Sequence, residues 1–470
     1  MQLLLMNSAR INFITQFLFL IAILNGTYIV YSDSQGLDGH AFRHLIPETF
    51  KRESQFQIIN EWKYLDFEYS TFVERKQAIL NGDFVPKNNL PLGIDVYRDR
   101  LFITTPRWKD GVPASLGTIP YPARETSPAI RPYPTWKAHG DPKTPDCSKL
   151  ISVYRTAIDK CDRLWLIDSG IVNATVNLNQ ICPPKIVVYD LKTDKEIIHY
   201  NLPESQVKQD SLHSNIVVDV GNSCDDAYAI VSDVWRFGLV VYSLSNNKSW
   251  RVTNYNFSPE PFASDFNIYG LNFQWLDGVF GMSISYDKRT NQRVLYFHPM
   301  ASFKEFMVPL DLLINEFIWQ TSSQETAKYF VSIGDRGYKS QSSTSGITRD
   351  GVMFYTQVHR DNIGCWDTAK PYTRGNMMLL FNQSYNGSNT ILQFPNDLKV
   401  DNEEQQNVWI MSNRLPIFLY STLDYSEVNF RILKASVSKI IYANHICNPG
   451  YKNSNDRKSA NVIIEEGQCY

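Results

Sequence analysis

The sequence predicts an all-β protein folded as a six-bladed β-propeller with a central channel. The first observation is a composition with 26 tyrosines, 26 phenylalanines and 10 tryptophans, since aromatic residues are enriched in strands. The second is a short apolar run that recurs along the chain and ends on polar residues each time. The six runs begin at residues 101, 164, 228, 294, 352 and 408. This spacing, 56 to 66 residues, indicates a structural repeat of one blade per unit.

Each unit contains further β-rich stretches that can complete a blade. After the second run, Lys185–Tyr189 and Glu196–Tyr200 are separated by turn-forming residues, which predicts a hairpin. The runs themselves are apolar at successive positions, a pattern typical of strands buried on both faces. We therefore expect these runs to be the innermost strands of the blades.

The chain of 470 residues divides into four predicted parts. Residues 1–32 contain the apolar stretch Phe17–Leu24, which is too short to span a bilayer and fits a signal peptide. Residues 33–58 form a polar N-terminal segment, residues 59–450 the single propeller domain, and residues 451–470 a polar C-terminal tail. We expect a secreted, extracellular protein without a membrane anchor.

The charges exclude several classes of partner. With 46 basic and 48 acidic residues and no block of like charge, neither a nucleic acid nor a membrane is expected as a partner. Sequons for N-glycosylation agree with secretion. They begin at Asn173, Asn247, Asn256, Asn382 and Asn386.

The cysteines favour disulfides over a metal site, because no CxxC spacing occurs and no histidine stands at zinc-ligand distance from a cysteine pair. Three bridges would use six of the seven cysteines, in any of 15 connectivities. Cys469, in the tail, is the expected odd cysteine and could link two chains. No metal or cofactor is predicted. The seven are Cys147, Cys161, Cys182, Cys224, Cys365, Cys447 and Cys469.

Polar residues stand where the apolar runs end, one for each predicted blade. Because innermost strands line the channel of a propeller, we expect these side chains to form a ring at one mouth. Each could equally be a strand-end residue bonded to backbone or solvent. The ring consists of Thr105, Asp168, Asp233, His298, Gln357 and Asn413.

Longer motifs closely resemble the insect yellow and major royal jelly protein family. They include LPLGIDVYRDRLFITTPRWKDGVPASLGTI from Leu90 to Ile119, AIDKCDRLWLIDSG from Ala157 to Gly170, and VWIMSNRLP from Val408 to Pro416. The Pro-Arg-Trp sequence at residues 106–108 makes the chain more similar to yellow proteins than to royal jelly proteins.

The resemblance implies a secreted six-bladed propeller whose last blade is closed by an N-terminal strand, here expected at Trp62–Phe67. Family members include cuticle proteins needed for melanin patterning, enzymes that convert dopachrome to a dihydroxyindole, and salivary relatives that bind serotonin and catecholamines in the channel. The fold alone does not decide among these roles.

Binding of a small aromatic amine or catechol-derived ligand is the first functional hypothesis. Asp168 or Asp233 could accept the ammonium group, with Thr356, Gln357 and Asn413 at the rim. Aromatic walls would suit the ligand ring. The candidates, which could equally be core residues, are Phe237, Phe280, Phe354 and Trp366.

Dopachrome isomerisation is the enzymatic alternative, and it needs a base, an acid and an acceptor for the substrate carboxylate. His298 is the expected general base, with Asp168 or Asp233 to orient or replace it. Arg107 could bind the carboxylate, although Arg107 stacked on Trp108 could simply fix the loop.

Two further alternatives stay open. A calcium-dependent lactonase would hold its ion on Asp168, Asp233 and Asn413. A non-catalytic cuticle-associated or nutritive protein would need none of these groups. The motifs of sialidase propellers, α/β-hydrolases, P-loop proteins and zinc proteases do not occur in the sequence.

Overall fold

The computed structural model describes residues 55–175, 178–287, 290–381 and 391–449. The expected signal peptide, the polar tail with Cys469, and the sequons at Asn382 and Asn386 lie outside these residues. Among the described helices, none has the length and apolar character needed to cross a membrane.

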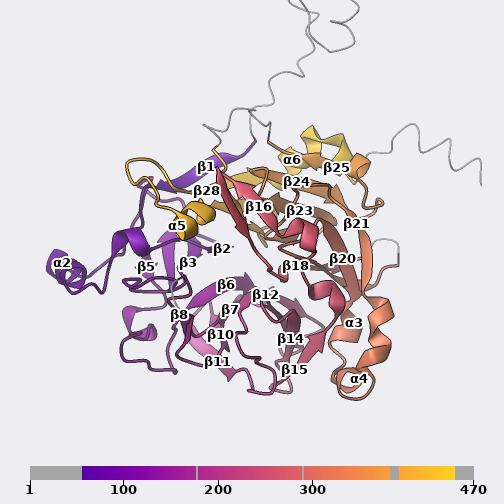
Figure 1. Ribbon diagram of the computed structural model, residues 1–470, viewed down its shortest axis with the longest axis horizontal. Coiled ribbons are helices and arrows are strands. Elements are labelled where there is room, and N and C mark those ends of the chain that lie inside the picture. Colours follow the sequence, from indigo (N-terminus) through magenta and orange to yellow (C-terminus); the bar gives the residue numbers. More distant parts are fainter. Residues whose placement is uncertain (1–54, 176–177, 288–289, 382–390, 450–470) are drawn as a thin grey trace, which may run out of the picture. The chain divides into compact units, whose positions relative to one another are not determined.

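Six four-stranded antiparallel sheets form the blades, which confirms the predicted propeller (Figure 1). From the axis outward, blade one consists of β2 (Gly93–Tyr97), β3 (Arg100–Thr104), β4 (Leu116–Pro120) and β5 (Arg131–Pro132). Blade two consists of β6 (Val153–Ile158), β7 (Arg163–Asp168), β10 (Lys185–Asp190) and β11 (Lys195–Asn201). Blade three consists of β12 (His213–Val220), β13 (Ala227–Asp233), β14 (Gly238–Ser243) and β15 (Lys248–Thr253).

The other three blades follow in chain order. Blade four consists of β18 (Val279–Tyr286), β19 (Arg293–Pro299), β20 (Lys304–Pro309) and β21 (Val331–Asp335). Blade five consists of β22 (Ser345–Ile347), β23 (Val352–Gln357), β24 (Asn362–Asp367) and β25 (Met377–Leu379). Blade six consists of β26 (Pro395–Val400), β27 (Asn407–Ser412), β28 (Phe430–Ser436) and β1 (Gln57–Trp62).

An N-terminal strand closes the last blade, as the family resemblance implies, but it is not the expected segment. β1 pairs with β28 through residues 57–62, whereas Phe67 bridges Ile130 of blade one in parallel. The first and last parts of the described chain are therefore held in one sheet.

The apolar runs of the sequence are the second strands of the blades, so their assignment as innermost strands is wrong. The strands that contact one another around the axis are β2, β6, β12, β18, β22 and β26. Second strands are apolar because a neighbouring blade covers each of their faces, and β7 and β23 are buried along their whole length. Innermost strands face the channel and carry polar residues such as Asp95, Arg155 and Asp397.

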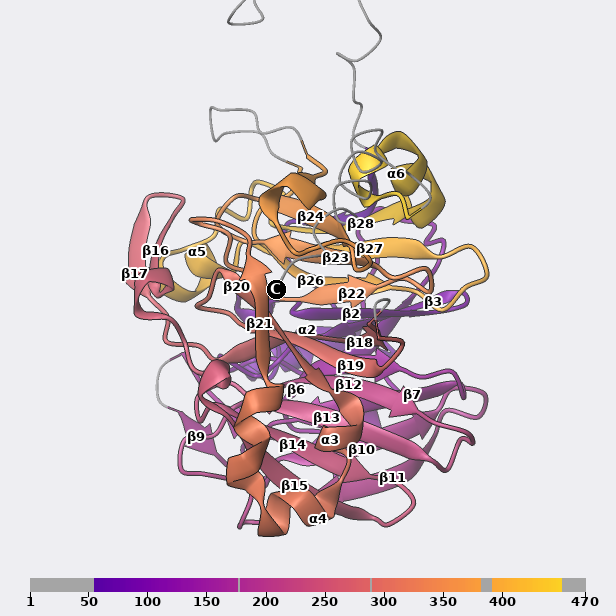
Figure 2. The ribbon, with the colours of Figure 1, turned by 90° about the vertical axis from the view of Figure 1, so that its right-hand side faces the viewer.

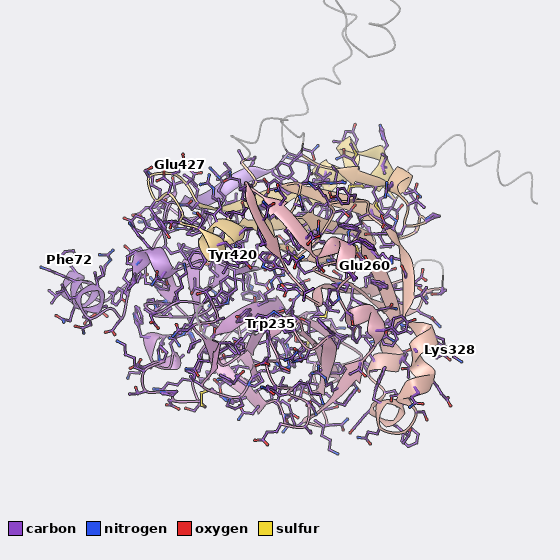
Figure 3. All side chains as sticks on the ribbon, in the orientation of Figure 1. Phe72, Trp235, Glu260, Lys328, Tyr420 and Glu427 are labelled. Carbon is purple, nitrogen blue, oxygen red and sulfur yellow. A yellow bond between two sulfur atoms is a disulfide. The ribbon has the colours of Figure 1, made fainter. Side chains whose placement is uncertain are left out.

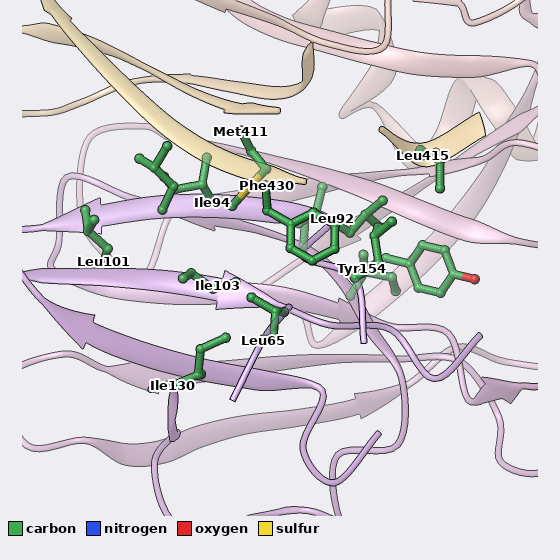
Figure 4. Close-up of a cluster of buried hydrophobic side chains, with 14 of the residues drawn as sticks. Leu65, Leu92, Ile94, Leu101, Ile103, Ile130, Tyr154, Met411, Leu415 and Phe430 are labelled. Atoms are coloured by element: carbon green, nitrogen blue, oxygen red, sulfur yellow. The ribbon is translucent and has the colours of Figure 1, made fainter. Parts of the chain in front are cut away.

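Apolar packing between adjacent blades forms the core. Figure 4 shows one such contact, where Ile94 and Ile103 of blade one meet Met411 and Phe430 of blade six. Burial of these side chains contributes about 1.5 to 3 kcal/mol each.

The remaining elements decorate the rims and the outer edge (Figure 2). Two short hairpins are formed by β8 (Ile171–Val172) with β9 (Asn179–Gln180) and by β16 (Asp265–Ile268) with β17 (Leu271–Gln274). The α-helices are α2 (Phe72–Leu80), α3 (Leu310–Leu313), α4 (Glu316–Thr321), α5 (Leu415–Tyr420) and α6 (Val437–Ala443). The 3-10 helices are Pro86–Asn88, Trp136–Ala138, Tyr255–Phe257, Pro261–Ala263, Ser323–Tyr329, Arg374–Asn376 and His445–Cys447.

Three disulfides confirm the prediction of three bridges and leave Cys469 as the odd cysteine. They join Cys147 to Cys182, Cys161 to Cys224, and Cys365 to Cys447. The second joins loops of blades two and three, and the third joins β24 to the C-terminal 3-10 helix.

Candidate functional site

At one mouth of the propeller, the described residues enclose a cavity of about 270 Å³. It lies at the end where innermost strands begin and second strands finish. Every blade contributes one lining residue, from the first two positions of its innermost strand or from the segment just before it. These six residues are Leu92, Tyr154, Leu212, Phe280, Ser343 and Asn396.

Tryptophan side chains form much of the cavity wall. Trp108 comes from the loop after β3, Trp235 follows β13, and Trp275 follows β17. Trp235 and Tyr420, another wall residue, are labelled in Figure 3. The site therefore suits a flat aromatic ligand.

The β16–β17 hairpin connects blades three and four but packs against elements of blades five and six. The ring of Phe273 stacks on Tyr420 of α5 at 4.9 Å, and Tyr269 donates a 2.6 Å hydrogen bond to Asp361 in blade five. Figure 2 shows the hairpin and α5 on the same side of the blades. This packing fixes the chain that runs from the hairpin into the cavity through Trp275 and Asp277.

Asp277 provides the one carboxylate among the described lining residues, which include no lysine, arginine or histidine. The indole Nε1 of Trp235 donates to its Oδ1 at 3.0 Å. Desolvation among the aromatic rings raises the pKa of Asp277 to about 6, and the Trp235 hydrogen bond opposes this rise. At neutral pH Asp277 is therefore an ionised base of useful strength.

Two tryptophan–tyrosine pairs also line the cavity. Trp108 donates its Nε1–H to the hydroxyl of Tyr154 at 2.6 Å, and Trp275 donates to Tyr420 at 2.5 Å. Burial raises the pKa of both tyrosines, and the charge of Asp277 adds to the rise in each. The carboxylate and both hydroxyls thus act within one electrostatic environment.

A buried ion pair closes the cavity floor on the channel axis. Arg155 lies 3.1 Å from Asp397, and neither side chain is exposed to solvent. Arg155 also donates to the carbonyl oxygens of Ser343 and Asn396, and its guanidinium lies 5.7 Å from the ring centre of Phe280. The charge of Arg155 is therefore neutralised below the cavity.

None of the seven residues predicted for the site lines this cavity. The polar ring lies at the predicted mouth, but one strand too far from the axis. Asp168 accepts from the amides of Ile151 and Ser152, at 2.7 and 2.8 Å, and pairs with Lys185. The predicted ligand acceptor is thus held by backbone and by a lysine.

The other ring members bind the loops that lead into the innermost strands. Asp233 accepts from the amide of Leu212 and pairs with Arg251. Thr356 accepts from the amide of Ser343, and Asn413 donates to the carbonyl of Pro91. Thr105 donates to the carbonyl of Ala114 within blade one, and Gln357 lines a separate, smaller pocket with Arg336 and Arg360.

His298 is fully buried in a charged network away from the cavity. Its Nδ1 lies 2.9 Å from Glu305, which also pairs with Arg336 at 2.7 Å. Burial lowers the pKa of His298, and the charge of Glu305 opposes this effect. The geometry supports a structural role.

Arg107 and Trp108, adjacent in the sequence, have different tasks. Arg107 is buried and donates to the carbonyls of Val112, Pro113 and Ile151, so it fixes the loop. Trp108 enters the cavity wall. Sequence analysis therefore placed the functional side chain of this pair on the wrong residue.

Phe280 is the one proposed aromatic wall residue that lines the cavity; Phe237, Phe354 and Trp366 pack in apolar clusters elsewhere. Asp277 was missed. Its signal in the sequence is an acid in an apolar setting, Trp-Leu-Asp-Gly at residues 275–278, directly before a strand.

The calcium alternative does not agree with the structure. Asp168 and Asp233 lie in different blades and are already paired with Lys185 and Arg251. In the described part of the chain, no three histidine, cysteine, aspartate or glutamate residues are grouped to hold a metal ion.

Comparison with known proteins agrees with this architecture. The family model described as Major royal jelly protein matches residues 151–447. Dopaminechrome tautomerase of Drosophila melanogaster is 70% identical over 460 residues, which are 98% of each chain. Protein yellow of the same organism is 38% identical over 390 residues, 82% of this chain and 69% of that protein.

Among solved structures, virginiamycin B lyase from Staphylococcus aureus matches with a TM-score of 0.39 and 11% identity, over 74% of this chain and 96% of that one. This likeness is too weak to support an argument. The sequence relatives are decisive: the chain belongs to the major royal jelly protein family, and it is closer to the yellow proteins than to the royal jelly proteins.

Proposed function

We propose that this protein is a secreted tautomerase that converts dopaminechrome, or a closely related aminochrome, into a dihydroxyindole during melanin formation. The observation that carries the proposal is Asp277, an ionisable carboxylate in an aromatic cavity with two tyrosine hydroxyls. The 70% identity to a dopaminechrome tautomerase over nearly the whole of both chains supports the same reaction.

The reaction is an isomerisation that needs no oxidant. One proton leaves each of the two saturated carbons of the five-membered ring, and one proton reaches each of the two quinone oxygens. A base near the carbons and hydrogen-bond donors near the oxygens are sufficient. Asp277 is the base in this proposal, and tryptophan faces hold the planar substrate.

The absence of cationic side chains among the described lining residues favours an uncharged substrate. Dopachrome carries a carboxylate, which Asp277 would repel, whereas dopaminechrome does not. Arg107, which sequence analysis assigned to that carboxylate, is occupied by backbone carbonyls. We therefore propose dopaminechrome in place of dopachrome.

The direct test mixes purified protein with freshly prepared dopaminechrome and follows the loss of its visible colour against a heated control. We expect acceleration, with a kcat/KM at least about 10-fold higher for dopaminechrome than for dopachrome, which corresponds to about 1.4 kcal/mol of repulsion. No acceleration with either compound would refute the proposal. A preference for dopachrome would refute the assignment of substrate.

Binding of catecholamines without turnover is the second candidate function. The observation that favours it is the same carboxylate surrounded by aromatic faces, which also suits an ammonium group. Quenching of tryptophan fluorescence by dopamine, in a protein that leaves dopaminechrome unchanged, would support this alternative.

A substitution of His298 separates the two candidate bases. We expect His298→Gln to leave the pH dependence of kcat/KM unchanged, because His298 lies outside the cavity. The variant should unfold more easily by about 1 to 3 kcal/mol, because Glu305 and Arg336 lose a buried partner. Loss of the acidic limb of the pH profile in a folded variant would contradict this expectation.

A further inference from the structure

The hydroxyl group of Tyr154 occupies an unusual position in the cavity. The side chain is 2% exposed and comes from β6, an innermost strand. Figure 4 shows its ring at the edge of an apolar cluster, with the hydroxyl pointing away from the cluster. The hydroxyl is therefore the polar end of a side chain that is otherwise fixed in the core.

Trp108 determines which way this hydroxyl can donate. Its Nε1–H donates to the Tyr154 oxygen at 2.6 Å, so the Tyr154 proton must point away from the indole. Trp108 is itself held, because the hydroxyl of Thr175 donates to its carbonyl oxygen at 2.8 Å. The pair is thus preorganised to offer one O–H to the cavity.

We propose, on the basis of the proposed function, that Tyr154 is a catalytic residue that hydrogen-bonds the quinone oxygen on which negative charge develops, and that Trp108 is its positioning residue. Asp277 takes a proton from a saturated ring carbon, and the electron pair of that C–H bond moves through the conjugated ring to this oxygen. The Tyr154 O–H stabilises the charge.

The protons balance without transfer of the Tyr154 proton. Burial raises the pKa of Tyr154, so its proton stays on the tyrosine. Asp277 releases the proton it took to solvent, and a solvent proton neutralises the substrate oxygen. A second proton loss from carbon and a second protonation of oxygen complete the dihydroxyindole.

Tyr420, in the second pair, is less suited to this task. Its side chain is 50% exposed, so water competes for its hydroxyl and screens any charge that it faces. The greater burial of Tyr154 makes its hydrogen bond to a developing charge the stronger of the two.

The test compares Tyr154→Phe with wild-type protein in the dopaminechrome assay. We expect kcat to fall about 100-fold, as on removal of an oxyanion donor. The rise of kcat/KM with pH should remain near pH 6, because Asp277 is unchanged. Tyr189→Phe is the matched control, since Tyr189 is also buried but its hydroxyl faces Glu196 outside the cavity; full activity is expected.

A double-mutant cycle tests the role of Trp108. If Trp108 acts through Tyr154, Trp108→Phe lowers kcat, and the variant with both substitutions is no slower than Tyr154→Phe alone. Fully additive losses would overturn the positioning role. Wild-type kcat in a folded Tyr154→Phe variant would overturn the inference and leave the proposed function intact, whereas inactive wild-type protein would overturn both.

Discussion

Asp277→Asn is expected to lower kcat/KM for dopaminechrome by about 1000-fold, within the range for loss of a general base. Asparagine has nearly the same shape and keeps an oxygen that can accept from the Trp235 indole, which now lies 3.0 Å from the carboxylate. The binding geometry is therefore conserved, and the loss should appear mainly in kcat. Colour-loss kinetics over a range of substrate concentrations separate kcat from KM.

The pH profile gives an independent measure of the same group. The base works when it is deprotonated, so kcat/KM of wild-type protein should fall as pH is lowered through about 6. Asp277→Asn should show no such limb. Asp265→Asn is the matched control, because this exposed aspartate lies in the hairpin just before the site and bonds only within the hairpin; its rate and profile should match wild type.

The stability of the variant excludes unfolding as an explanation. The pKa of Asp277 is raised on folding from 3.8 to about 6, so the folded state is progressively penalised as pH rises through this interval. Above pH 6 the penalty is fully present. Asp277→Asn should therefore be more stable than wild type at pH 8, by about 1 to 2 kcal/mol. A large activity loss accompanied by a lower unfolding midpoint would contradict the assigned role.

The sequence predicted the blade number and the mouth that carries the site, because one strand per blade is apolar at successive positions. It failed at the next level of detail. Apolarity at successive positions reports burial between blades, which is greatest for second strands such as β7 and β23. Distance from the axis leaves a different trace, namely polar residues such as Arg155 and Asp397 on strands that are otherwise buried.

The same misassignment explains the missed site residues. Asp168 and Asp233 end the second strands and bind the loops that carry Ile151 and Leu212, so they support the mouth without entering it. Asp277 comes from the loop after an inserted hairpin, outside the repeat from which the ring was derived. Repeat spacing cannot locate such a residue, because its position depends on how the hairpin packs.

The floor of the cavity leads to the largest expected effect on stability. Asp397→Ala should reduce the free energy of unfolding by about 3 to 5 kcal/mol, because it leaves the guanidinium of Arg155 buried without its carboxylate. The amide of Ile94 also loses an acceptor, which now lies 2.9 Å away. Urea unfolding followed by tryptophan fluorescence measures the change.

Two comparisons separate the cost of an unpaired charge from the loss of an attraction. Glu68→Ala removes the partner of Arg131 in an ion pair whose side chains are 50% and 71% exposed, and it should cost less than about 1 kcal/mol. Replacement of both floor residues, Arg155→Met with Asp397→Leu, should recover much of the stability lost in Asp397→Ala. A cost below about 1 kcal/mol for Asp397→Ala would show that Arg155 reaches solvent or another anion, in which case the channel below the cavity is open and the site has two mouths.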